Sequence, residues 1–95
     1  MKHKKSYSLN ARRMTTREEA HAHLKERLKL PDWYGNNLDA LHDCLNEIGE
    51  PTRIVLHFAA RLDHLPDGYG AKLLRVLRQA AEENPNIKLT LYNRI

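Results

Sequence analysis

The chain has 95 residues, of which 41% are hydrophobic and 29% charged. This composition fits one soluble domain over residues 1–95 and leaves no room for two. Its single cysteine excludes an internal disulfide framework, and no apolar run is long enough for a membrane-spanning helix. The basic stretch Met1–Lys5 is not followed by apolar residues, so we expect no secretory signal and a cytoplasmic location.

The charge is distributed unevenly. Lys and Arg outnumber Asp and Glu by 16 to 12, and the resulting net charge of +4 is by itself typical of proteins that bind nucleic acid. Residues 31–52, however, contain five acids and no Lys or Arg, a net charge of −5, so the remainder carries +9. Charge runs are usually solvated surface. This one would repel phosphates and would suit a basic partner.

The N-terminal part predicts a short strand and then a helix. Polar and apolar residues alternate over residues 6–9, which favours a strand. Thr15 and Thr16 each have a glutamate three positions later, the capping-box pattern that begins a helix. Apolar residues at every fourth position then extend this helix to about Leu28, and Pro31 ends it.

A second helix is predicted with Asn37 as its N-cap, and Gly49 and Pro51 close it. Its apolar residues recur at spacings of 3, 4 and 3, so they share one face that should pack inward. These residues are Leu38, Leu41, Leu45 and Ile48.

The C-terminal half predicts two more strands and a helix. The nearly continuous apolar run over residues 53–58 suits a strand buried on both faces. A connection over 62–70 with room for a helical turn leads to a helix over 71–83, and a turn at 84–86 precedes an alternating strand over 87–92. The order β-α-α-β-α-β predicts an α/β fold with a small three-stranded parallel sheet and packed helices.

A polar trio on the second helix raises the question of catalysis. Asp39, His42 and Asp43 are spaced as neighbours on one face and could form an acid/base cluster or a metal site, but three ligands from one helical stripe rarely converge. Cys44 lies two positions from His42 and diverges from it, so we expect Cys44 to be a partly buried small residue. His57, in the predicted central strand, is expected to be partly buried and hydrogen-bonded. We therefore predict no enzyme, no metal and no cofactor.

The same region is better suited to binding a protein. Trp33 and Tyr34, if exposed, place two aromatic side chains just before the acidic helix, and aromatic anchors beside charges are typical of protein–protein hot spots. The alternative is that one aromatic packs inside, which we expect for Tyr34 rather than Trp33, and that the acids are ordinary solvated residues.

The segment LPDWYGNNLDALHDCL, residues 30–45, closely resembles the signature of the barstar family, small cytoplasmic inhibitors of barnase-type secreted ribonucleases. The predicted element order resembles the family fold more weakly over the whole chain. The resemblance implies a single barstar-like domain whose second helix enters the ribonuclease active site, where its acids mimic RNA phosphates. It implies no small-molecule substrate and no membrane.

By position, the resemblance gives Asp43 the role of the central acid, placed against the enzyme's catalytic Arg and His groups, with Asp39 beside it. Trp33 corresponds to an aromatic that stacks on the nuclease. Three further residues line the same contact: Gly35, Asn37 and Leu38.

The sequence departs from the family pattern in three ways. His42 stands where the family often has tryptophan, and could be pH-sensitive beside its acidic neighbours. Gln79, in the last helix, stands where an interface glutamate is expected. The net charge of +4 contrasts with the generally acidic barstars. These departures bear on which nuclease is bound more than on how it is bound.

A second hypothesis makes the protein a basic nucleic-acid-binding regulator, although a terminal run of charge is most often a solubilising tail. The residues it would use are Lys2, Lys4, Lys5, Arg12, Arg13 and Arg17.

Overall fold

A computed structural model describes residues 5–93, which form three strands, three α-helices and short 3-10 turns. The strands and α-helices are β1 (Lys5–Asn10), α1 (Arg17–Leu28), α2 (Leu38–Asn46), β2 (Thr52–His57), α3 (Tyr69–Glu83) and β3 (Ile87–Leu91). The 3-10 turns are η1 (Ala11–Arg13), η2 (Ala59–His64) and η3 (Pro66–Gly68). Within residues 5–93, no helix combines the length and the apolar character that crossing a bilayer requires.

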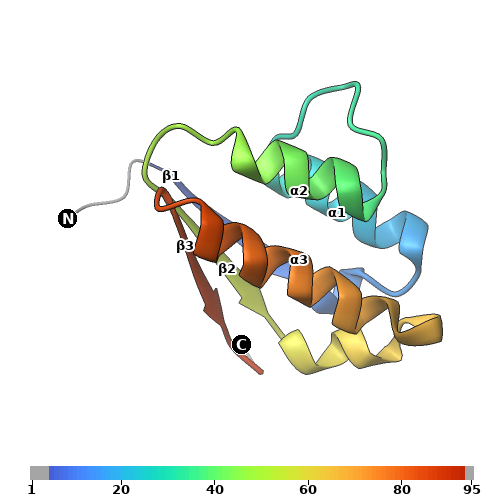
Figure 1. The fold of residues 1–95 in the computed structure, drawn as a ribbon. Helices are drawn as coiled ribbons and strands as arrows, with labels where there is room; N and C mark the ends of the chain where they lie inside the picture. The colour runs from blue at the N-terminus through green and yellow to red at the C-terminus, as the bar shows by residue number, and fades with distance from the viewer. Residues whose placement is uncertain (1–4, 94–95) are drawn as a thin grey trace.

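The strands form one parallel sheet in the order β1-β2-β3, which confirms the predicted fold. Tyr7 pairs with Ile54, and Ile54 pairs with Leu89. Parallel neighbours cannot be joined by a tight hairpin, so helical segments make both connections. Figure 1 shows α2 beside α3, with which it packs, whereas α3 packs on β3 and α1 packs on β1.

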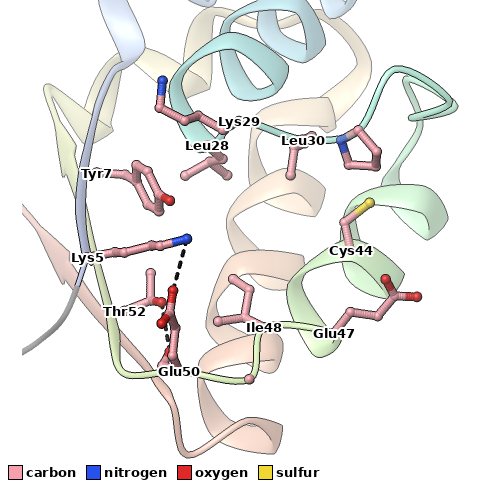
Figure 2. A pocket seen from close by; sticks show the side chains of 12 residues that line it. Lys5, Tyr7, Leu28, Lys29, Leu30, Cys44, Glu47, Ile48, Glu50 and Thr52 are labelled. Atoms are coloured by element: carbon pink, nitrogen blue, oxygen red, sulfur yellow. Dashed lines mark hydrogen bonds and ion pairs between the residues drawn. The ribbon is translucent and has the colours of Figure 1, made fainter.

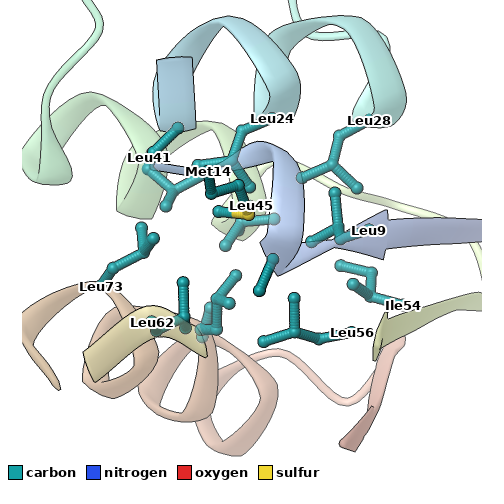
Figure 3. Packing of buried hydrophobic residues seen from close by; sticks show 14 of the residues in the cluster. Leu9, Met14, Leu24, Leu28, Leu41, Leu45, Ile54, Leu56, Leu62 and Leu73 are labelled. Atoms are coloured by element: carbon teal, nitrogen blue, oxygen red, sulfur yellow. The ribbon is translucent and has the colours of Figure 1, made fainter. Parts of the chain in front are cut away.

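The core lies between the sheet and the helices (Figure 3). Its members come from every strand and α-helix, so burying them fixes the position of α2 relative to the sheet. The labelled side chains that are at most 2% exposed are Leu9, Met14, Leu24, Leu41, Leu45, Ile54, Leu56, Leu62 and Leu73.

β2 is predicted to be buried on both faces, and the structure confirms this for the core face and, on the other face, for Val55 alone. Ile54 and Leu56 join the core, but Arg53 and His57, which alternate with them, are only half-buried. Val55 is buried without belonging to the core cluster, and it lies between its register neighbours Ser8 on β1 and Thr90 on β3. A central strand of a small sheet can hide an apolar residue in this way without a second layer of helices.

Helix caps follow the predicted chemistry closely. Thr16 is the N-cap of α1, and its hydroxyl accepts a hydrogen bond from the Glu19 backbone N–H at 3.0 Å. The Glu19 carboxylate accepts from the Thr15 hydroxyl, so only half of a reciprocal capping box forms. Lys29 adopts a left-handed conformation with φ of 55°, and the Leu30 N–H bonds to the Lys25 carbonyl, which closes the helix.

Two features near α3 differ from prediction. α2 ends at Asn46, two residues early, and the buried Asn84 side chain donates to the carbonyls of Leu45 and Ile48, each at 3.0 Å. α3 begins at Tyr69, so Gly70 is helical. A Cβ on Gly70 would lie 1.8 Å from the Leu62 carbonyl oxygen, so this glycine allows α3 to pack against the backbone of η2.

Candidate functional site

The two adjacent aromatic residues in the loop before α2 differ in exposure. Trp33 is 69% exposed, whereas Tyr34 is only 4% exposed. The expectation that both are exposed is therefore wrong, and the alternative, that Tyr34 packs inside, is correct. The burial of Tyr34 fixes the loop backbone directly beside the exposed Trp33.

Tyr34 is anchored by a buried histidine from α1. The Tyr34 hydroxyl lies 2.6 Å from Nδ1 of His21, and the Tyr69 hydroxyl of α3 lies 2.5 Å from Nε2 of the same ring. Burial, and then the charge on Arg17, lowers the pKa of His21, so the ring is neutral at pH 7. A neutral imidazole has one donor and one acceptor, so it can bond both hydroxyls and tie the loop to two helices.

Sequence analysis did not identify His21 as a residue of this region. Its partners lie 13 and 48 positions away in the chain. No local pattern could have indicated the contact.

Asn37 begins α2 as predicted. Its side-chain oxygen accepts from the Ala40 N–H at 2.7 Å, and its side-chain amide donates to the Gly35 carbonyl at 3.2 Å. Both ends of the amide are thus used to join the loop to the helix. Leu38 follows as a half-buried residue packed on the core.

The acidic face of α2 consists of Asp39 and Asp43, one turn apart. Both are exposed, while Leu41 and Leu45 of the same helix are buried. Within residues 5–93, neither carboxylate forms an ion pair. The segment thus presents two uncompensated negative charges on a helix whose other face is fixed in the core.

His42, between these acids, turns toward α3. Its Nε2 lies 2.8 Å from Oε1 of Glu83, and Asn46 lies 3.3 Å from the same oxygen. Gln79 donates to the other Glu83 oxygen at 3.1 Å. These hydrogen bonds, chiefly the one from His42, lower the pKa of Glu83.

Glu83 therefore brings His42 and Gln79, two predicted site residues, into one network that spans α2 and α3. Neither Glu83 nor Asn46 could be predicted as a site residue from the sequence, because Glu83 lies 41 positions from His42 and 37 from Asn46. His42 faces Glu83 rather than forming a unit with the acidic face, and no group of three metal-ligating side chains converges anywhere in residues 5–93.

Residues 5–93 match the family model described as Barstar (barnase inhibitor). The chain belongs to the barstar family. A Bacillus subtilis (strain 168) protein, whose printed name is "Putative ribonuclease inhibitor YrdF", is 39% identical over 67 residues, which cover 70% of this chain and 74% of that protein. The parallel sheet and packed helices agree with membership of the barstar family.

In this barstar-family chain, Cys44 lies in a pocket of about 280 Å³ between the ends of α1 and α2 (Figure 2). The Lys5–Glu50 ion pair, 2.9 Å long, borders the same pocket. Burial, and then the nearby carboxylates of Glu47 and Asp43, raises the pKa of the Cys44 thiol. The thiol is therefore protonated and weakly reactive, which fits its predicted role as a small buried residue.

The described residues of the basic cluster in the second hypothesis do not form one patch. Lys2 and Lys4 lie outside the described residues. Lys5 begins β1 and pairs with Glu50, whereas Arg12 follows the other end of β1 and stacks on Phe58 at 4.1 Å. Arg17 lies over the Tyr69 ring at 4.3 Å. The described members are separated by the length of a strand, which disfavours a shared contact with nucleic acid.

Proposed function

We propose that this protein is an inhibitor of a barnase-type secreted ribonuclease, and that it occludes the active site with α2 and the preceding loop. One observation carries the proposal: in a member of the barstar family, Asp39 and Asp43 are exposed and uncompensated on a fixed helix, beside the exposed Trp33.

The charge argument supports this mechanism. A ribonuclease cleft must be basic because it binds phosphate, and a carboxylate on a rigid helix can take the place of a phosphate. Because the core already holds α2 and Asn37 caps it, little conformational entropy is lost on binding. The acidic segment would also steer the encounter, despite the net positive charge of the chain.

Each site residue then has a distinct proposed role. Asp43 is the central acid and Asp39 the flanking one, and Trp33 is the aromatic anchor. Tyr34 positions the loop rather than contacting the nuclease with its ring, because its side chain is buried against His21. The remaining contact residues are Gly35, Asn37, Leu38, His42 and Gln79.

No catalytic step is involved in this mechanism, since occupying the cleft is enough to block RNA. A cytoplasmic inhibitor would protect a cell that makes a toxic ribonuclease until the enzyme is exported. The same arrangement requires a protein partner and no cofactor.

The test is a titration of RNA cleavage by a panel of barnase-type ribonucleases. We expect stoichiometric inhibition that Asp43→Ala weakens by at least ~2 kcal/mol, the scale of an interface hot spot. Asp63→Ala, which removes an exposed acid from η2, is the matched control and should leave inhibition unchanged.

The interface assignment is wrong if Asp43→Ala and Trp33→Ala both leave inhibition intact. Tight RNA binding with a steep salt dependence, and no inhibition of any nuclease in the panel, would instead support the nucleic-acid hypothesis.

A further inference from the structure

A second cavity, of about 640 Å³, opens where β1 and β2 end and the chain passes into η1 and η2. In open parallel sheets, ligands bind outside the carboxyl ends of the strands. The volume lies within the range of small-molecule sites. None of its lining residues belongs to α2 or to the loop that precedes it.

Three arginines from two elements line this basic cavity. Arg12 and Arg13 come from η1, and Arg27 comes from α1, with Glu26 as the acid among the lining residues. Within residues 5–93, none of the three arginines is ion-paired to a carboxylate. The cavity therefore has a surplus of positive charge that the surrounding residues leave uncompensated.

Two of these arginines are held in place while most of their donors stay available. Arg27 donates from Nε to the Ser8 carbonyl at 2.9 Å, which leaves four of its five N–H groups. The Arg12 guanidinium lies over the Phe58 ring. Guanidinium groups fixed in this way are pre-ordered for the bidentate contacts that phosphate oxygens make.

Two histidines complete the lining. Nε2 of His23 accepts from the Asn10 N–H at 2.9 Å, so this ring is bonded. Neither ring nitrogen of His57 forms a hydrogen bond within residues 5–93, and its Nδ1 is buried. The ring is held by stacking on Tyr92, at 5.6 Å between centroids. The expectation of a hydrogen-bonded His57 is therefore wrong.

We propose that the basic cavity binds the phosphate group of a small ligand, either the free ion or a nucleoside monophosphate. A single phosphate is favoured over an RNA backbone because the cations surround one cavity, and because Glu26 would repel an adjoining phosphate. The site is independent of the inhibitor surface, so it stands whether or not the protein inhibits a nuclease.

The test is calorimetric titration of the full chain with inorganic phosphate, adenosine 5′-monophosphate, adenosine and a ten-nucleotide single-stranded RNA. We expect saturable binding of a phosphate-bearing probe, no binding of adenosine, and a loss of affinity of at least ~10-fold in Arg13→Gln. Arg61→Gln, which removes an exposed arginine of η2 outside the cavity, is the matched control. Glu26→Gln should tighten binding a few-fold, a gain that a misfolded variant could not produce.

Binding of inorganic phosphate alone would identify the free ion as the ligand, and tighter binding of the monophosphate would identify an organic phosphate. Either result supports the site if Arg13→Gln weakens it and Arg61→Gln does not. The proposal is overturned if neither phosphate probe binds or if both variants lose affinity equally. It is also overturned if the RNA binds far more tightly, with a salt slope that reports several phosphates.

Discussion

The acidic face of α2 and the basic cavity at the carboxyl ends of β1 and β2 differ in shape as well as in charge. On α2, two carboxylates project from an ordered helix beside an exposed tryptophan. In the cavity, arginines from η1 and α1 line a shared space. A projecting charge suits insertion into another protein's cleft, whereas converging charges suit a small ion that fits inside. The net charge of +4 reflects neither region.

Reversing one charge in each region should produce the largest effects and separate the two functions. Asp43→Arg places a cation against a basic cleft, and we expect inhibition to weaken by about several kcal/mol. Phosphate binding should not change. Arg13→Glu should abolish phosphate binding and leave inhibition intact. Both quantities are measured in the single variants and in the double variant.

Independent regions should give additive effects in the double variant. If Arg13→Glu weakens inhibition as strongly as Asp43→Arg does, the two regions form one binding surface and do not have separate functions.

Acidification should destabilise the fold through two histidines: His21, which bonds Tyr34 before α2, and His23, which lines the basic cavity. Burial lowers the pKa of both His21 and His23 below the ordinary value of 6.5. Below about pH 6.5, the unfolded chain therefore binds protons that the folded chain does not, and stability falls as the pH drops. Urea unfolding at pH 7 and pH 5 measures this loss.

Each of His21→Gln and His23→Gln should reduce the difference between the two pH values. A difference that persists unchanged in the double substitution would show that other groups cause it. Glu83 also has a lowered pKa, but its contribution to stability would be lost only as the pH falls below its ordinary value of 4.5.

The smallest effect is expected at the junction of α2 and α3. Glu83→Gln removes the charge that holds His42 but keeps a side chain of similar shape. Because these groups are exposed, we expect only a few-fold change in nuclease inhibition. The inhibition constant is compared with that of Glu82→Gln, an exposed neighbour on the same helix. A loss as large as that of Asp43→Ala would place Glu83 at the centre of the interface.

Much of the architecture could be predicted because it depends on local patterns. Alternation and apolar runs identified the strands, and the spacing of apolar residues on α2 identified the face that is buried. Asn37 and Thr16 cap helices because a short polar side chain reaches a backbone N–H three positions away. The connection after β2 was harder, since Gly70 resembles a loop residue until its close approach to Leu62 is known.

The sequence by itself determined the order of elements, the family and the acidic segment, because each depends on residues that are close together in the chain. Only the tertiary structure decided which residues anchor Tyr34, which carboxylate faces His42 and which cations line one cavity. His21 reaches Tyr69 across 48 positions, and His42 reaches Glu83 across 41. Such contacts exist only after the core has brought the helices and the sheet together, since periodicity specifies the face of an element but not its partner.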